Sequence, residues 1–236
     1  MKTLDFKAGE VLLVNKPLHW TSFDVVNKLR YEIKQHLGIK KIKVGHAGTL
    51  DPLADGLLII CTGKMTKSIE SYMGLEKAYS GTITLGATTP SYDLETEIDH
   101  TFPTADLSKE NIQEAANKML GEYDQYPPIF SAKKVKGKKA YDLARAGKEV
   151  ALKPKRITIQ QFDLTRIAIP EVDFLITCSK GTYIRSIAHD LGKSLGNGGH
   201  LTALRRESIG NFQLKDAKSV DEWIEIIKNN PQPELV

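Results

Sequence analysis

The apolar positions of this chain change their spacing along its length, so that strands and helices are both predicted. The alternation over residues 10–15 predicts a strand. Over 22–37 the apolar residues recur at helical spacing, with Thr21 or Ser22 as the N-terminal cap and Gly38 at the end. Further strands are expected over 57–61, 77–85, 156–169 and 172–179, and further helices over about 64–72, 108–121, 138–146, 184–195 and around Trp223, Ile226 and Ile227.

These strands and helices do not follow a regular β-α-β alternation. We therefore expect an α/β protein of the α+β type, with a mixed, largely antiparallel sheet flanked by helices. A length of 236 residues suits one domain, residues 1–236. The segment from about 124 to 153 differs from the rest because Pro127-Pro128 and a lysine cluster interrupt regular structure. It is interpreted as an insertion into that domain; a surface loop is the alternative.

The net charge of +4 says little, but the positions of the charges say more. Residues 131–156 contain ten basic and two acidic residues, and residues 27–43 contain six basic and one acidic residue. The rest of the chain is therefore acidic on balance. Two basic segments on an acidic body are typical of a protein that binds a polyanion at a defined surface. A solvated helix face and a lysine-rich loop would be the simpler explanation.

Several protein classes are disfavoured by composition. No apolar run approaches the roughly 20 residues that cross a bilayer, and the first residues lack the apolar centre of a signal peptide. Cys61 and Cys178 lie in apolar, strand-like runs, so we expect buried free thiols and a cytoplasmic protein. The six histidines and two cysteines are scattered, which does not suggest a metal site.

The most distinctive segment is His46-Ala-Gly-Thr-Leu-Asp51-Pro-Leu-Ala-Asp-Gly56. Its glycines and Pro52 exclude a continuous helix, so Asp51 is expected on an irregular loop, where functional groups concentrate. A histidine precedes this carboxylate and an apolar strand follows it. The alternative is a tight turn whose aspartate binds nearby backbone amides.

This segment and four others resemble, in order, the motifs of the TruB family of tRNA pseudouridine synthases. The resemblance implies the pseudouridine synthase fold, with residues 124–153 as a thumb-like insertion that closes over RNA. It also implies isomerisation of uridine 55 in the T loop of tRNA, with no metal or cofactor. Many bacterial members carry a small C-terminal RNA-binding domain of the PUA type, which this chain has no room for after Arg206. The other four segments are Lys16-Pro17 with Trp20-Thr21-Ser22, Lys77-Ala78-Tyr79, Lys180 to Ser186, and His200 to Arg206.

The resemblance assigns three catalytic residues. Asp51 would be the essential carboxylate, and attack on C1′, attack on C6 and removal of the C2′ proton all remain open roles for it. Arg185 would keep Asp51 ionised, unless it forms a structural ion pair instead. Tyr79 would stack on the extruded base and accept the C5 proton, a core-facing tyrosine being the alternative.

Five further residues are assigned to substrate binding. His46 would enter the RNA and occupy the vacated stack, and Tyr183 would line the pocket. Leu204 would cap the pocket with apolar surface. The simpler explanations are a surface or core histidine and packing residues. Asp93 would touch the target nucleotide, although Pro90 and Thr96 depart from the family pattern, and Lys16 would shape the pocket floor or support the Asp51 loop.

The expected partner is the T arm of tRNA, bound by a monomer without a protein partner. Arg205, Arg206 and the lysines of residues 133–139 are expected to contact phosphates. Two other functions stay open: a non-catalytic RNA-binding or RNA-folding protein, and a guide-RNA-dependent subunit related to dyskerin.

Overall fold

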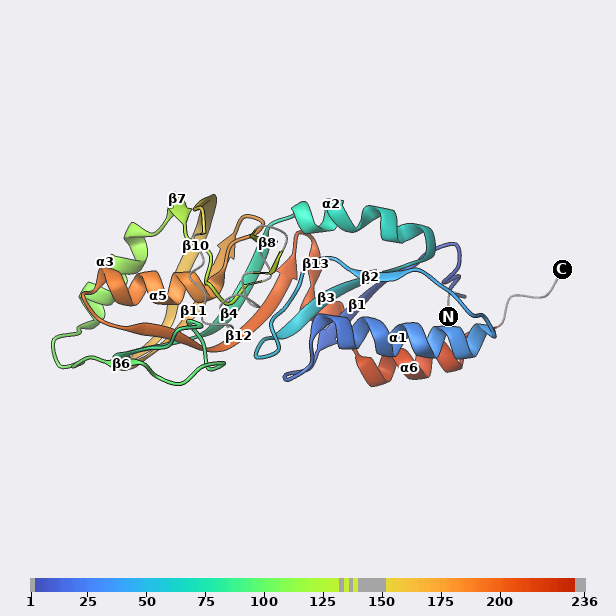
Figure 1. The fold of residues 1–236 in the computed structure, drawn as a ribbon, viewed down its shortest axis with the longest axis horizontal. Coiled ribbons are helices and arrows are strands. Elements are labelled where there is room, and N and C mark those ends of the chain that lie inside the picture. The colour runs from blue at the N-terminus through green and yellow to red at the C-terminus, as the bar shows by residue number, and fades with distance from the viewer. Residues whose placement is uncertain (1–2, 132–133, 136–137, 140–151, 232–236) are drawn as a thin grey trace. The chain divides into compact units, whose positions relative to one another are not determined.

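The computed structural model describes residues 3–131, 134–135, 138–139 and 152–231 and divides the chain into two compact units. Unit 1 contains residues 1–77 and 205–236, and unit 2 contains residues 78–204. Each unit is built on strands with helices packed against them (Figure 1). The expected α+β class with a largely antiparallel sheet is confirmed.

In unit 1 the strand order is β14-β1-β3-β12, with β2 added to β3. β1 and β2 are antiparallel to β3, whereas β12 is parallel to it. Between Lys77 and Arg205 the chain runs through unit 2. The elements of unit 1 are β1 (Val11–Lys16), α1 (Ser22–Leu37), β2 (Val44–His46), β3 (Asp55–Thr62), the 3₁₀ helix η1 (Gly63–Ser68), α2 (Ile69–Gly74), the end of β12 (Gly199–Ile209), β13 (Phe212–Gln213), η2 (Leu214–Asp216), β14 (Lys218–Ser219) and α6 (Val220–Lys228).

β3 lies at the centre of unit 1 and is buried on both faces. Leu58 and Ile60 point into a cluster with α1 and α6, whereas Leu57 and Ile59 point into a second cluster on the other face. A strand covered on both faces needs a continuous apolar run, which is why every residue from Leu57 to Cys61 is apolar instead of alternating with polar residues. Figure 1 shows α1 and α6 on one side of these strands and α2 on the other.

The helix ends of unit 1 agree with the sequence signals. The Thr21 side chain accepts a hydrogen bond from the Asp24 amide and Asp24 binds back to Thr21, so that together they form a capping box. Gly38 has φ 61°, the left-handed conformation that ends helices and that glycine adopts without strain. The helix predicted over 22–37 is therefore confirmed at both ends.

In unit 2 the strand order is β12-β4-β11-β10-β7. α3 packs against β10 and α5. β8 and β9 pair with each other as a two-stranded ribbon, and so do β5 and β6. The elements of unit 2 are β4 (Lys77–Leu85), β5 (Ala87–Thr88), β6 (His100–Thr101), α3 (Lys109–Lys118), β7 (Gly121–Gln125), β8 (Lys134–Val135), β9 (Lys138–Lys139), β10 (Lys155–Ala168), β11 (Glu171–Cys178), α5 (Ile184–Ser194) and the start of β12.

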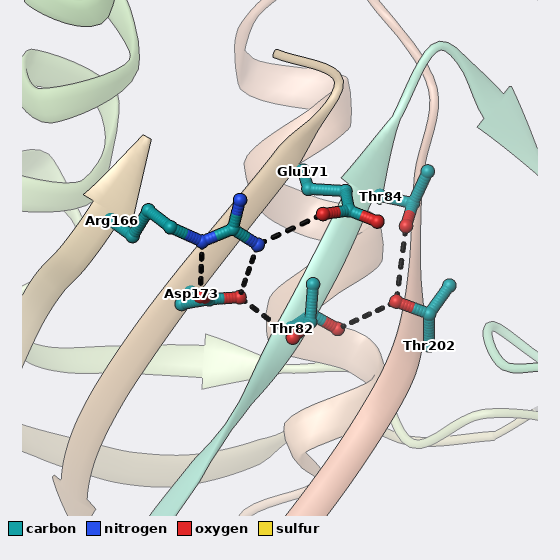
Figure 2. A network of polar contacts seen from close by, with 6 residues as sticks. All are labelled: Thr82, Thr84, Arg166, Glu171, Asp173 and Thr202. Atoms are coloured by element: carbon teal, nitrogen blue, oxygen red, sulfur yellow. Dashed lines mark hydrogen bonds and ion pairs between the residues drawn. The ribbon is translucent and has the colours of Figure 1, made fainter. Parts of the chain in front are cut away.

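A polar network joins four of these strands (Figure 2). Arg166 on β10 donates to Asp173 on β11 through Nε at 2.6 Å and pairs with Glu171 at 2.9 Å. Asp173 in turn accepts from Thr82 on β4 at 2.8 Å. Thr202 on β12 lies 3.0 Å from Thr84 and donates to the Thr82 carbonyl. Cross-strand pairs of this kind fix the register of neighbouring strands.

Some predicted elements differ from the structure. The helix expected over 64–72 is a 3₁₀ turn followed by a short α-helix, because Thr66 Oγ1 donates back to the Gly63 carbonyl in a tight first turn. Of the helix expected over 138–146, Lys138–Lys139 is a strand that pairs with Lys134–Val135, and residues 140–146 lie outside the described part. On α6 the buried residues are Val220, Ile224 and Ile227, which follow the helical period, whereas Ile226 is only half-buried.

The thiol prediction is confirmed, since Cys61 and Cys178 are both buried and are not joined by a disulfide. Burial raises the pKa of the Cys61 thiol to about 11, which leaves it protonated and unreactive at neutral pH.

Candidate active site

The Asp51 loop connects β2 to β3 inside unit 1 and is fixed by contacts with two neighbouring segments. Ser22, the first residue of α1, accepts from the Leu50 amide at 2.8 Å and donates to the Leu50 carbonyl at 3.1 Å. The His19 amide donates to the Pro52 carbonyl at 2.7 Å. The residue before Asp51 and the residue after it are therefore both held, which limits how far the carboxylate can move.

Arg206 on β12 holds the base of the same loop. Its side chain is buried, and Nε donates to the Leu57 carbonyl at 2.7 Å. The two terminal nitrogens donate to the carbonyls of Gly48 at 3.1 Å and Thr49 at 3.5 Å. Gly56 has φ 104°, and a Cβ there would lie 2.5 Å from the Arg206 carbonyl oxygen, so glycine is required where the strands meet.

The expectation that Arg205 and Arg206 contact phosphates is wrong for Arg206, whose guanidinium is buried and bound to backbone carbonyls. Arg205 is exposed but forms a two-point pair with Asp55 at 2.9 and 2.8 Å. The parallel pairing of β12 with β3 sets Arg205 opposite Asp55 and turns Arg206 into the interior. Within unit 1, Arg206 therefore holds the loop, whereas Arg205 pairs with the first residue of the strand that follows it.

Lys16 brings a second buried cation to this region. It is fully buried at the end of β1, and its Nζ donates to the carbonyls of Pro17 at 2.9 Å and Trp20 at 2.7 Å. Burial lowers the pKa of Lys16 to about 8, while the carboxylates of Asp55 and Asp51 oppose the decrease. Lys16 is thus close enough for its charge to interact with the carboxylates of Asp55 and Asp51.

This pKa predicts a pH-dependent stability. The unfolded chain holds the Lys16 proton up to about pH 10.5, whereas the folded protein releases it near pH 8. Because the unfolded state binds more protons in that window, the Lys16 contribution to the free energy of unfolding rises between about pH 8 and 10.5. The gain is on the order of 3 kcal/mol, at about 1.4 kcal/mol per pKa unit.

Urea denaturation of wild type and Lys16→Met from pH 7 to 10 measures this contribution. The difference in free energy of unfolding between the two proteins should change with pH, whereas the matched change at exposed Lys215, Lys215→Met, should give a constant difference. A constant difference for Lys16→Met as well would contradict the assignment.

His46 stands at the start of the Asp51 loop and is half-buried. Burial and the nearby Arg206 charge lower its pKa, and a hydrogen bond with the Gly48 backbone only partly opposes them. The imidazole is therefore neutral at pH 7. A histidine ring is one of the aromatic groups on which unstacked RNA bases stack.

Unit 2 holds the other predicted site residues, and among them the structure pairs Arg185 with Asp93. Arg185 lies in the first turn of α5, with Nε 3.6 Å from Asp93 Oδ2 and a terminal nitrogen 3.2 Å from the Ser91 carbonyl. Both side chains are buried. Asp93 Oδ1 also accepts from the Glu95 amide at 3.0 Å. A buried pair of this kind requires both partners, because either charge alone would be costly.

The three remaining residues lie on different elements of unit 2. Tyr79 is on β4 and is buried, with 9 % of its surface exposed. Tyr183 caps the N-terminus of α5, and its amide donates to Gln125 Oε1 at 2.8 Å. Leu204 ends the part of β12 that belongs to unit 2 and is half-buried. Asp51, His46 and Lys16 thus belong to unit 1, and Tyr79, Asp93, Tyr183, Arg185 and Leu204 belong to unit 2.

Sequence reasoning missed the roles of Ser22 and Arg206. The sequence marks Ser22 as a possible helix cap and as part of a family motif. Its hydroxyl also binds both backbone groups of Leu50, which the sequence does not indicate. Because Arg206 follows Arg205 directly, the sequence predicted an exposed pair of arginines that contacts phosphates. The one available signal was Gly48 and Gly56 on either side of Asp51, which indicate that another backbone or a large side chain approaches closely.

Neither a metal-binding cluster nor a membrane-spanning helix is found among the described residues. No three histidine, cysteine or carboxylate groups within the described residues gather into a set that would hold a metal ion. None of the described helices combines the length and the apolar character needed to span a bilayer.

Two solved structures of Cbf5 complexes contain a chain with a similar fold. The chain in a crystal structure of a Cbf5-Nop10-Gar1 complex matches with a TM-score of 0.69 and 25% identity over 93% of this chain. A chain in the archaeal box H/ACA sRNP Nop10-Cbf5 complex matches with a TM-score of 0.66 and 22% identity. This chain spans about half the length of each, at 54%. This chain therefore shares its fold with these two chains.

Sequence comparisons define the family. Residues 34–184 match the N-terminal domain of the TruB family pseudouridylate synthases, and residues 185–232 match the tRNA pseudouridylate synthase B C-terminal domain. The tRNA pseudouridine synthase B of Phocaeicola vulgatus is 54% identical over 225 residues, covering 94% of this chain and 96% of that protein. The Flavobacterium johnsoniae protein of the same name is 55% identical over 214 residues, covering 90% and 93%. The chain belongs to the TruB family.

Proposed function

We propose that this protein isomerises uridine 55 in the T loop of tRNA to pseudouridine, with Asp51 as the essential carboxylate. The observation that carries the proposal is the Asp51 loop, held by Ser22 and Arg206 beside the buried Lys16. The sequence also supports the proposal, because two bacterial relatives that are more than half identical to this chain are named tRNA pseudouridine synthase B.

The reaction rearranges bonds within one nucleotide. The N1–C1′ bond breaks and a C5–C1′ bond forms, C5 loses its proton to water, and N1 gains one. The base must leave the RNA stack to turn over. Asp51 would act on C1′, on C6 or on the C2′ proton, and each role requires an ionised, positioned carboxylate. The positive charge of Lys16 favours that state.

The roles of the other candidate residues belong to the same proposal. Arg185 would hold Asp51 in addition to its pair with Asp93, and Asp93 would touch the target nucleotide. Tyr79 would stack on the extruded uracil and take up the C5 proton, with Tyr183 and Leu204 lining the pocket. His46, as a neutral ring, would fill the space that the base vacates.

Partners and location follow from the same proposal. The chain would act on the T arm as a cytoplasmic monomer, without a protein partner or guide RNA. It would need no metal or cofactor, because proton transfer and a carboxylate suffice for the chemistry. Within the thumb-like segment 124–153, residues 132–133, 136–137 and 140–151 lie outside the described part. Closure of this segment over the RNA therefore stays a prediction.

Tritium release tests the proposal. Purified protein and a tRNA transcript labelled with tritium at uridine C5 should release close to one tritium per tRNA, and a transcript with cytidine at position 55 should release none. Release with no other component present excludes a guide-dependent subunit. Binding without release would indicate the alternative, a non-catalytic RNA-binding protein.

A further inference from the structure

A basic groove lies in unit 1 at the end of β3 away from Asp51, and its lining includes Val44 and Gly45 of β2. Its main part has a volume of about 750 Å³ and is lined by α1, the following loop and η1. A second part of about 320 Å³ adjoins it and shares Lys41, Ile42, Lys43 and Thr66. Eight basic residues and no acidic residue line the two parts: Lys7, Arg30, Lys34, Lys40, Lys41, Lys43, Lys64 and Lys67.

Backbone contacts bring these residues together from four segments. The Gly63 amide donates to the Lys43 carbonyl at 2.9 Å, and the Lys64 amide donates to the Ala8 carbonyl at 3.2 Å. Arg30 on α1 donates to the Val44 carbonyl at 2.9 Å. The positive surface is therefore assembled by the fold, and residues 7, 30, 43 and 64 are adjacent only because of it.

Few of these charges are neutralised within the molecule. Across the described residues no ion pair involves Lys34, Lys40, Lys41, Lys43, Lys64 or Lys67, and the one acid of residues 27–43, Glu32, pairs with Lys28 outside the groove. A cation near the end of α1 stabilises the helix dipole, which explains Lys34. It does not explain the exposed lysines 40, 41 and 43, which follow the helix.

The groove and Asp51 lie toward opposite ends of β3, although the groove lining reaches Gly45, next to His46 at the start of the loop. Thr62 pairs with Val44 at the groove end of β3, whereas Asp55 is paired with Arg205 at the loop end. β3 has eight residues, so at about 3.3 Å per residue its ends are about 23 Å apart. An RNA that reaches both positions must extend well beyond the target loop.

We propose that this groove binds the phosphate backbone of tRNA outside the T arm. The proposal rests on the proposed function, since it takes the RNA in the groove to be the substrate of the Asp51 site. A positive, open groove without acidic residues selects a polyanion, and several phosphates at regular spacing match lysines from several segments better than a single anion does. The groove would increase affinity for whole tRNA and leave the chemical step unchanged.

The test compares two double variants with the same charge change. Lys41→Glu/Lys43→Glu alters residues shared by both parts of the groove, and Lys215→Glu/Lys218→Glu alters exposed lysines of unit 1 elsewhere. Affinities of both variants for full-length tRNA and for an isolated T-arm hairpin are measured between 50 and 300 mM salt, values chosen because phosphate contacts weaken steeply over roughly that range. Turnover of the saturating hairpin and thermal unfolding are measured alongside.

For the groove variant, affinity for full-length tRNA should fall about 10-fold or more, and the slope of log K against log salt should decrease by about 2, one for each lost phosphate contact. Its hairpin affinity, hairpin turnover and melting temperature should match wild type, as should all properties of the control variant. Equal losses with both variants, an equal loss for hairpin and tRNA, or no loss would each overturn the proposal. If wild type bound tRNA without turnover, the proposed function would fail. The affinity of the groove variant for tRNA, compared with that of the control variant, would still decide whether the groove binds RNA.

Discussion

Replacing Asp51 with asparagine should reduce tritium release by about 10³-fold or more, because even proton transfer alone contributes about 10²–10⁴-fold to such reactions. Asparagine keeps the shape of the side chain, and the Ser22 and Arg206 contacts that fix the loop involve backbone groups of its neighbours. The variant should therefore fold and bind tRNA as wild type does. Single-turnover assays at saturating protein separate the chemical step from binding.

A neighbouring carboxylate provides the control. Asp55→Asn alters the pair with Arg205 at the edge of the same loop, where the arginine is exposed. It should keep most of the turnover. Substantial turnover by Asp51→Asn, or equal losses in the two variants, would show that the reaction does not depend on the Asp51 carboxylate in particular.

Replacing Arg206 with methionine should give the largest loss of stability. The change removes the donor from the buried carbonyl of Leu57 and from the part-buried carbonyls of Gly48 and Thr49, and an unsatisfied buried group costs about 1–3 kcal/mol. A decrease in the free energy of unfolding of about 3 kcal/mol or more is expected. Turnover should fall even at temperatures where the variant stays folded, because the Asp51 loop loses its support.

Arg205→Met is the matched comparison for this variant. Arg205 is exposed and its partner Asp55 is partly solvated, so the pair contributes about 1 kcal/mol or less. Urea denaturation and single-turnover rates of the two variants distinguish the roles. Similar effects at both positions would contradict the assignment of Arg206 as the residue that positions the loop.

Much of unit 1 could be predicted from the sequence, because its signals are local. The cap at Thr21, the apolar period of α1 and Gly38 are all within one helix, and the continuous apolar run after the loop marks β3. β12 was not predicted, since its apolar and polar residues do not alternate regularly. Its position depends on pairing with strands far away in the sequence.

The candidate site shows the same division. The glycines and proline around Asp51 predicted a constrained loop, and the structure confirms it. The role of Arg206 was not predictable, because its partners are carbonyls about 150 residues earlier in the chain and a backbone carbonyl has no sequence signature. The Arg185–Asp93 pair also joins segments that are far apart in the sequence, and the expected pairing of Arg185 with Asp51 stays a prediction.

The most direct test of the central claim is to map the modified base. A tRNA transcript incubated with the purified chain is treated with a carbodiimide that leaves a stable adduct on pseudouridine, and reverse transcription then reports where synthesis stops. The proposed function predicts one new stop, immediately 3′ of position 55, with wild type and none with Asp51→Asn. A stop elsewhere in the tRNA, or no stop under conditions where the protein binds the transcript, would contradict it.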